Sequence, residues 1–498
     1  MADDEAPPTP TEHEPPPGVT TDRTWDGPDG PVPYVASAGW TVLRKDDKPV
    51  AEVFSVSYVV EGEGRPVSFV FNGGPGASST FLHLGVAGPR RLVMNADGSL
   101  PAVPAHVVDN EDSWLAFTDL VFVDPVGTGF SRVIDRSSGG EGDAAKQPDA
   151  KEFFAVKRDL EAMAEFIERW LSEHGRWGAP VFIAGESYGG YRVGRLARIL
   201  QEATGVGLNG AVLISPALEV TALSPSDYDM TTWIDTLPVM ALAATEHGRS
   251  RAFGADADPD EVTAEAEAFA QGDYARFLVQ GASMDAGERH AVLERQADLL
   301  GLPVELVERA EGRISMQVFS RELLRDERRI VGLYDASITA SDPFPDRAQF
   351  AGPDPTLAGD HAAYTTAVNR VLRQELGVDT VRDYRVLSYD VFNAWKDDVA
   401  TQAFVPSQGA TDDLRYGMAL NPHMLVFITH GRHDMVTPYF ASDRLRNLMR
   451  LDPSAGDRLR VRHFPGGHMF YARESSRRAF GEAMAAFVAD AVQTGGAK

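Results

Sequence analysis

A serine between two glycines is the first feature of the sequence that could carry out chemistry. Residues 185–189 read Gly-Glu-Ser-Tyr-Gly, directly after the apolar run PVFIA and before the helix-compatible segment YRVGRLARILQEA. In a sharp turn from a strand into a helix, a serine is pushed into the open, and flanking glycines leave room for the turn. This context predicts that Ser187 is a nucleophile. The alternative is a serine that only caps the helix.

A serine hydroxyl is a poor nucleophile unless a base activates it and an acid orients the base. Asp434 follows the apolar run MLVFITHG, and His468 lies in the glycine-rich segment PGGHMFY after LRVRHF. Functional loops of α/β folds follow the ends of strands. We therefore predict Asp434 as the acid and His468 as the base. The alternatives are an aspartate that ties its own turn and a histidine on a surface loop.

Three other histidines compete for the role of base. His430, His433 and His463 lie in or beside predicted strands and are not followed by a glycine-flanked loop. His430 and His433 also suggest a metal pair, but no third ligand stands at a metal-site spacing. The sequence therefore predicts no metal, and the chemistry is complete without a cofactor.

A second glycine-rich loop follows the apolar run VSFVF. It reads Asn72, Gly73, Gly74, Pro75 and Gly76, and its backbone can approach a substrate closely. Acyl transfer needs amide donors for the developing oxyanion, one of which is the amide after the nucleophile, here that of Tyr188. We predict that this loop supplies the other donor. The alternative is a plain tight turn.

The elements that position these residues follow from the apolar pattern. Residues 34–58 predict an antiparallel hairpin, because two β-branched and aromatic segments flank RKDDK. Nearly continuous apolar runs, typical of strands that are buried on both faces, occur at 67–71, 119–124, 180–185, 209–215 and 424–431. Apolar residues from Phe153 to Leu171 recur at helical spacing. The alternation of strands and helices predicts an α/β domain.

Four regions are predicted along the chain. Residues 1–24 are acidic and proline-rich without an apolar signal segment, and we expect a disordered leader. Residues 25–220 form the first part of the catalytic domain and residues 390–498 the second. Between them, residues 221–389 are rich in Ala, Glu, Arg and Leu, which predicts an inserted, mainly helical cap.

Composition excludes several classes of partner. The chain of 498 residues has a formal net charge of −26, which repels nucleic acid and anionic lipid. It has no uninterrupted apolar stretch of about 18 residues, so no membrane span is predicted. It has no cysteine, and therefore no disulfide or thiolate chemistry. Without a signal segment we expect a cytoplasmic location, or secretion if a signal has been removed. Composition does not predict the oligomeric state.

Five segments together resemble the serine carboxypeptidase family. They cover about 300 residues of both parts of the catalytic domain, and they are FNGGPGASS (71–79), NEDSWLAFTDLVFVDPVGTGFS (110–131), GESYGG (185–190), GRHDMVTP (431–438) and FPGGHMF (464–470). The resemblance implies an α/β-hydrolase fold with a mostly parallel central sheet, helices on both faces and an inserted helical cap. It also implies an enzyme whose substrate is a peptide and which removes single residues from the C-terminus.

The same resemblance implies roles for individual residues. Ser187, Asp434 and His468 form the catalytic triad, and the amides of Gly74 and Tyr188 form the oxyanion hole. The terminal carboxylate of the substrate is held by Asn72, Gly73 and Glu186. A glutamic acid donates to a carboxylate only when it is protonated, which explains why such enzymes often prefer acidic conditions.

The sequence departs from the family at the carboxylate site. The family usually has a second glutamate three residues before the Gly-Pro pair, and here that position is Val86. Arg90 and Arg91 follow and could bind a carboxylate, although solvated surface arginines are the simpler interpretation. Ala77 replaces the usual cysteine.

The leading hypothesis is a serine carboxypeptidase. An acyl hydrolase or acyltransferase acting on non-peptide esters or amides is the second, and a non-catalytic partner protein that kept the fold is the third.

Overall fold

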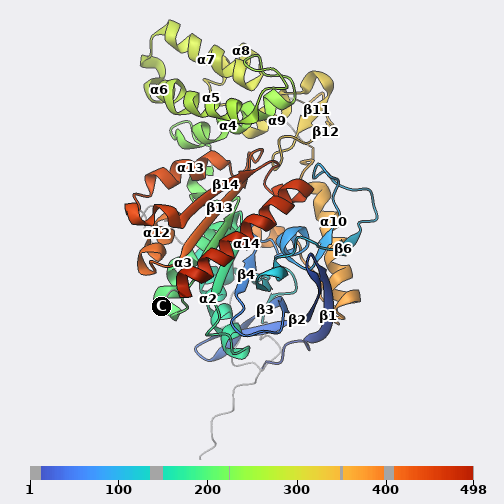
Figure 1. The fold of residues 1–498 in the computed structure, drawn as a ribbon. Coiled ribbons are helices and arrows are strands. Elements are labelled where there is room, and N and C mark those ends of the chain that lie inside the picture. Colours follow the sequence, from blue (N-terminus) through green and yellow to red (C-terminus); the bar gives the residue numbers. More distant parts are fainter. Residues whose placement is uncertain (1–12, 135–149, 224, 348–351, 397–408, 497–498) are drawn as a thin grey trace, which may run out of the picture.

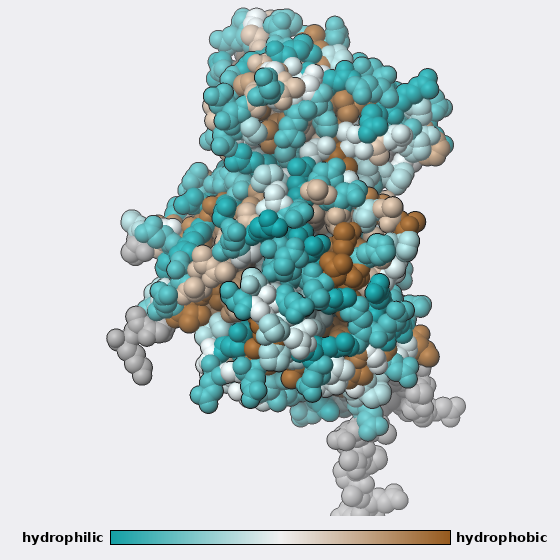
Figure 2. All heavy atoms as spheres, turned by 45° about the vertical axis from the view of Figure 1, so that its right-hand side comes forward, coloured by the Kyte–Doolittle hydropathy of each residue, from teal (hydrophilic) through white to brown (hydrophobic). Residues whose placement is uncertain are grey.

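The computed structural model describes residues 13–134, 150–223, 225–347, 352–396 and 409–496. Within these ranges the chain forms a central sheet covered by helices, with a separate helical lobe at one end (Figure 1). Figure 2 shows this lobe standing on the larger body that contains the sheet.

The central sheet is antiparallel at one side and parallel through the rest. Its order is β1-β2-β3-β7-β4-β9-β10-β13-β14, and β1 to β3 pair antiparallel. The strands are β1 (Val19–Gly27), β2 (Gly30–Lys45), β3 (Lys48–Val59), β4 (Val67–Phe71), β7 (Asp119–Val123), β9 (Val181–Glu186), β10 (Gly210–Ile214), β13 (Leu425–Gly431) and β14 (Leu459–Phe464). From β7 to β14 neighbouring strands are parallel. The predicted hairpin and the five predicted buried strands are confirmed.

Helices cover both faces of the sheet because each has an apolar side that must be buried. One face packs on α2 (Val156–Glu173), α3 (Tyr188–Ile199) and α12 (Ala410–Leu420). The other packs on α10 (Ala358–Asn369) and α14 (Glu474–Gly496), and α14 crosses in front of the strands in Figure 1. Every apolar residue of the predicted helical face from Phe153 to Leu171 is buried. The predicted α/β-hydrolase fold is therefore confirmed.

The separate lobe has its own apolar core. It contains α4 (Thr231–Glu246), α5 (Pro259–Phe269), α6 (Ala275–Gln280), α7 (Ala286–Leu300), α8 (Val304–Arg309) and α9 (Met316–Glu322). The hairpin of β11 (Arg329–Val331) and β12 (Thr339–Ser341) follows at its edge. We call residues 231–341 the cap. Smaller elements elsewhere are α1 (Thr80–Leu82), β5 (Arg90–Leu92), β6 (Val107–Asp109), β8 (Arg132–Val133), α11 (Tyr389–Ala394) and α13 (Tyr439–Leu448).

Two predicted boundaries need correction. The leader does not extend to residue 24, because β1 begins at Val19 and its Trp25 is buried in the core; residues 1–12 of the predicted leader lie outside the described residues. The C-terminal part of the predicted 221–389 cap belongs to the hydrolase body, where Tyr364, Val368 and Val386 join the core of the sheet. A helix-forming composition shows that a segment is helical, but not which surface its apolar side covers.

Among the helices of the described residues, none has the length and apolar character needed to cross a membrane.

Candidate active site

Ser187 lies in a strained turn between β9 and α3. Its backbone is in the left-handed region, with φ 61° and ψ −123°, and its amide donates to the Ile214 carbonyl of β10 at 2.9 Å. A Cβ atom on Gly185 would lie 2.1 Å from the Gly189 carbonyl oxygen, and one on Gly189 would lie 2.8 Å from that of Phe71. Only glycines permit this turn, which presents the serine side chain at the carboxyl end of the parallel strands.

The structure brings Asp434 and His468 together. His468 Nδ1 lies 2.7 Å from Asp434 Oδ2. The other carboxylate oxygen, Oδ1, accepts the amides of Val436 at 2.9 Å and Thr437 at 3.0 Å. The Thr437 hydroxyl donates to Oδ2 at 2.6 Å. A carboxylate that receives so many donors is held in one orientation, and it fixes the imidazole in turn.

His468 is buried beside a negative charge. Burial disfavours its protonated form, but the charge of Asp434 and the hydrogen bond to it outweigh burial and raise the pKa of His468 above its usual value. Ser187 and His468 line the same pocket, which has a volume of about 70 Å³. An imidazole oriented in this way is suited to accept the proton of a serine hydroxyl.

The competing histidines all have partners elsewhere. His430 lies between the Thr437 carbonyl and the Ser442 hydroxyl, at 3.0 and 2.8 Å. His433 Nε2 lies 3.0 Å from Glu246, and His463 Nε2 lies 2.9 Å from Asp443. Across the described ranges, no group of three or more His, Asp or Glu side chains has the arrangement of a metal site.

The loop after β4 lies directly against the nucleophile turn. A Cβ atom on Gly73 would be 2.5 Å from Tyr188 N and 2.6 Å from the Glu186 carbonyl oxygen. Gly74 has φ 101°, a conformation that favours glycine. Within the described part of the chain, neither the Gly74 nor the Tyr188 amide donates to a protein group outside regular helices and strands. Two unengaged amides beside Ser187 are the arrangement that an oxyanion requires.

A buried arginine fixes this loop to the helices. Arg192, on the first turns of α3, donates to the Asn72 carbonyl at 2.9 Å and to both Asp159 carboxylate oxygens at 2.9 and 3.2 Å. Asp159 lies on α2 and is also buried. The pair therefore ties α2, α3 and the loop after β4 into one support for the site.

Glu186 is held by two side chains. Asn72 Nδ2 donates to Glu186 Oε1 at 3.1 Å, and the Tyr471 hydroxyl donates to Oε2. Burial raises the pKa of Glu186 to about 7, although the nearby His468 charge and the bonds from Tyr471 and Asn72 favour the ionised form. Asn72, Gly73 and Glu186 all line the pocket of Ser187. The structure thus brings together every residue that the sequence predicted for the triad, the oxyanion hole and the carboxylate site.

Tyr471 is the part of the site that sequence reasoning missed. Val86, which stands where the family has its second glutamate, is fully buried. A Cβ atom on the adjacent Gly85 would lie 2.6 Å from the Tyr471 ring and 2.9 Å from the Tyr364 hydroxyl. The glycine leaves room for Tyr471 to reach Glu186. The available signal was an aromatic residue three positions after His468.

The two arginines after Val86 do not reach the site. Arg90 pairs with Glu375 and Asp109 at 3.0 and 2.6 Å, and Arg91 lies 3.3 Å from Glu111. Neither arginine lines the pocket of Ser187.

The end of the cap supports the histidine loop. The Tyr334 carbonyl accepts the His468 amide at 2.5 Å, and its ring meets the imidazole edge-on with centroids 5.3 Å apart. The Asp335 carboxylate accepts the Gly467 amide at 2.9 Å. These residues come from the turn between β11 and β12, so the cap directly contacts the loop that carries His468.

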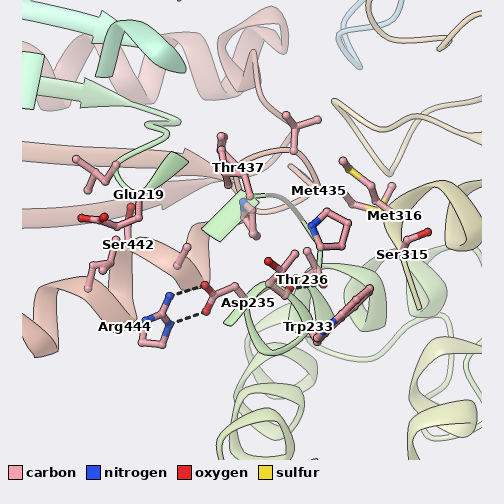
Figure 3. A pocket seen from close by; sticks show the side chains of 18 of the residues that line it. Glu219, Trp233, Asp235, Thr236, Ser315, Met316, Met435, Thr437, Ser442 and Arg444 are labelled. Carbon is pink, nitrogen blue, oxygen red and sulfur yellow. Dashed lines mark hydrogen bonds and ion pairs between the residues drawn. The ribbon is translucent and has the colours of Figure 1, made fainter. Parts of the chain in front are cut away.

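A second pocket lies where the cap meets the hydrolase body (Figure 3). Met435 and Thr437, from the loop that carries Asp434, form one wall, and Trp233 of α4 lies opposite. Asp235 of α4 receives two hydrogen bonds from Arg444 of α13, at 2.8 and 2.7 Å. This ion pair joins the cap to the body beside the acid loop.

Comparison with known proteins agrees with this geometry. A family model described as serine carboxypeptidase matches residues 54–249, which include the loop after β4 and the turn of Ser187. This part of the chain is therefore similar to the serine carboxypeptidase family. The match ends before Asp434 and His468, whose place in the site comes from the structure.

Curated members of the family are similar to parts of the chain. Serine carboxypeptidase-like 36 of Arabidopsis thaliana is 29% identical over 191 residues, which are 38% of this chain and 36% of that protein. Pheromone-processing carboxypeptidase kex1 of Neosartorya fischeri is 36% identical over 134 residues, or 26% of this chain and 17% of that protein. The chain therefore spans well under half the length of these carboxypeptidases.

Solved structures are more distant. A proline iminopeptidase from Mycobacterium smegmatis aligns over 92% of this chain and 100% of its own, with 12% identity and a TM-score of 0.36. A putative aryl esterase from Burkholderia cenocepacia gives 14% identity and a TM-score of 0.34, over 95% of this chain and 100% of its own. Neither likeness adds to what the sheet order already shows.

Proposed function

We propose that this protein is a serine carboxypeptidase that releases C-terminal residues from peptides through an acyl-enzyme. The observation that supports this most is that one pocket is lined both by the hydrogen-bonded pair Asn72 and Glu186 and by Ser187 and His468. A site for a free carboxylate beside a nucleophile suits a substrate whose scissile bond is the last peptide bond.

The proposed reaction begins with attack of Ser187 Oγ on the last peptide carbonyl. His468 accepts the serine proton, and Asp434 stabilises the imidazolium that forms. The amides of Gly74 and Tyr188 donate to the oxyanion. Collapse of the tetrahedral intermediate breaks the C–N bond, and His468 returns the proton to the departing amine. Water then attacks the acyl-enzyme by the same route and frees Ser187.

Recognition of the terminal carboxylate falls to Asn72, Gly73 and Glu186. Two carboxylates in contact repel each other unless one carries a proton. With a pKa of about 7, Glu186 retains its proton in mildly acidic solution and can donate to the substrate. The family's second glutamate is replaced here by Val86, and the Tyr471 hydroxyl makes the second hydrogen bond to Glu186 instead.

The test is to compare N-blocked dipeptides that have a free C-terminal carboxylate with the matching C-terminal amides, between pH 4 and 8. We expect strong preference for the free acids, and no cleavage by Ser187→Ala. Equal or faster cleavage of the amides would show that the carboxylate site does not select the substrate.

Val86 supports one alternative function. Without the second acid, the same triad could act on esters or amides that have no terminal carboxylate. Simple acetyl esters distinguish the two: faster turnover of esters than of peptide acids at every pH would favour a general acyl hydrolase or transferase. If Ser187 failed to react with a fluorophosphonate probe, the remaining explanation would be a non-catalytic partner protein.

A further inference from the structure

A buried acid lies next to the active site but outside the residues assigned so far. Asp360, in the first turn of α10, is 5% exposed. It lines a small pocket together with Leu100, Ile338, Tyr334 and Met469. Tyr334 and Met469 also line the pocket of Ser187 and His468, so the two pockets are neighbours.

The Asp360 carboxylate has no protein partner among the described residues: no hydrogen bond or ion pair reaches it there. Its neighbour Asp354 differs, because it accepts from Leu333 N at 2.7 Å and from the Thr356 amide and hydroxyl at 2.9 and 2.6 Å. Burial, with a smaller contribution from the charge of Asp354, raises the pKa of Asp360 to about 7. An acid buried without a partner must either retain its proton or bind a cation.

The helix end does not account for this placement. A carboxylate near a helix N-terminus gains a modest stabilisation from the helix dipole. However, no side chain caps α10, since its first residue outside the helix is Leu357. Capping therefore explains neither the burial of Asp360 nor its position in a pocket shared with active-site residues.

The other groups of the pocket favour a cation. Asp335 is a second acid in the lining, and Leu100, Ile338 and Met469 offer apolar walls for an alkyl stem. The lining contains no lysine or arginine among the described residues. Arg473 lies nearby but is directed to Asp335, at 3.8 Å.

We propose that Asp360 is a specificity residue that binds the ammonium or guanidinium group of a lysine or arginine beside the scissile bond. The substrate class is then a peptide with a basic residue at one of its last two positions. This inference rests on the proposed carboxypeptidase function. A desolvated cation against Asp360 would form a charge-assisted hydrogen bond that no neutral side chain can replace.

The experiment compares kcat/KM for N-blocked dipeptide acids that carry lysine, norleucine or glutamate at the last or the penultimate position. Norleucine has the alkyl stem of lysine without its charge. In the wild-type protein at pH 8 we expect lysine to exceed norleucine on the order of 10- to 100-fold at one of the two positions, as for a hydrogen bond to a charged group. Glutamate at that position should be the poorest.

The variant Asp360→Asn should abolish the advantage of lysine over norleucine and leave norleucine cleavage within about threefold, whereas the exposed Asp379→Asn should change neither. The lysine-to-norleucine ratio should also rise with pH between 6 and 8 as Asp360 loses its proton, since Glu186 and His468 affect both substrates alike. The titratable groups that face Asp360 are Asp354, Tyr364 and Tyr471, and Tyr334 and Asp335 line the same pocket.

Three outcomes would overturn the proposal. Equal cleavage of lysine and norleucine peptides by the wild-type protein does so without any variant and leaves the carboxypeptidase function intact. A lysine preference that survives Asp360→Asn places the cation elsewhere. If no peptide acid is cleaved while esters are, the proposed function and the subsite fail together.

Discussion

Glu186 experiences opposing influences at the scale of one side chain. Burial favours its neutral form and raises its pKa to about 7, while the positive charge of His468 and the hydrogen bond from Tyr471 favour the ionised form. Only the neutral form can donate to a substrate carboxylate. Cleavage of peptide acids should therefore decline as pH rises through about 7. Esters without a carboxylate need only neutral His468, and their cleavage should rise with pH.

Removing the Tyr471 hydroxyl tests this balance. In Tyr471→Phe the ionised form of Glu186 loses a donor, so its pKa should rise further. The alkaline decline in kcat/KM for peptide acids should then move to higher pH, while the ester profile stays in place. Steady-state rates between pH 5 and 9 measure the shift.

The surface variant Tyr416→Phe is the control, because among the described residues the Tyr416 hydroxyl is hydrogen-bonded to Glu202 alone, at 3.2 Å. A peptide-acid profile that is unchanged, or that moves to lower pH, would contradict the role given to Tyr471.

At the scale of elements, several polar contacts join the cap to the hydrolase body. One is the ion pair of Asp235 on α4 with Arg444 on α13 (Figure 3). The Asp235 side chain is almost fully buried, at 3% exposed, whereas that of Arg444 is 22% exposed. Burial raises the pKa of Asp235 despite the bonds from Arg444. Loss of Arg444 should therefore destabilise the fold more than loss of Asp235, because Asp235 is the more deeply buried partner.

We expect Asp235→Ala to lower the free energy of unfolding by about 2 kcal/mol, because the freed Arg444 can turn toward water. Arg444→Ala should cost more, about 3 kcal/mol or above, since it leaves a buried acid without its partner. Urea unfolding followed by Trp fluorescence measures both, and Trp233 beside the pair reports on the cap joint.

The exposed acid of the cap, Asp273, provides the control, and Asp273→Ala should change stability by less than about 0.5 kcal/mol. Equal losses for Asp235→Ala and Arg444→Ala would show that burial does not set the cost.

Local sequence was sufficient for the buried strands and for the loop positions of Ser187, Asp434 and His468 after them, because each depends on neighbours within a few residues. An apolar run ending in a glycine-rich loop contains both the strand and the exposed position after it. Tyr471 and Tyr334 were not predictable in this way. Their roles depend on which segments meet in space, as when Gly85 leaves room for a ring 386 positions later in the chain.

The same reason explains the two corrected boundaries. The polar residues at the start of β1 give a weak strand signal, and the strand is stabilised by pairing with β2 and by burial of Trp25. Helix α10 has the composition of the cap, yet Tyr364 packs against Phe81 in the body, with ring centroids 4.7 Å apart. In both cases contacts between segments far apart in the sequence determine where the boundary lies.

At the scale of the whole molecule, charge and buried acids act in the same direction. Burial raises the pKa values of Asp124, Glu186 and Asp360 to about 7. Between about pH 4 and 7 the folded state retains protons that the unfolded chain has lost, so these groups make stability fall as pH rises through that window. The net charge of −26 adds repulsion that also grows with pH.

Buried histidines oppose this trend only at lower pH. Burial lowers the pKa of His83 to about 3 and that of His430 well below its usual value. The unfolded chain binds protons at both positions below about pH 6.5, so their effect is to make stability rise with pH up to that value and to stop there. Above it, the buried acids and the repulsion remain. Stability should therefore fall most steeply above about pH 6.5, where the histidines no longer oppose the acids.

We predict that the free energy of unfolding in urea falls between pH 6 and 8, and that raising NaCl from about 50 to about 500 mM at pH 8 restores part of the loss by screening repulsion. Asp124→Asn should make the pH dependence shallower, because it removes one buried acid while its side-chain oxygen can still accept the Ser79 amide, at 2.9 Å in the wild-type protein. Exposed Asp379→Asn should leave the slope unchanged. If stability rose from pH 6 to 8 at low salt, ion pairs rather than the buried acids would control the pH response of the fold.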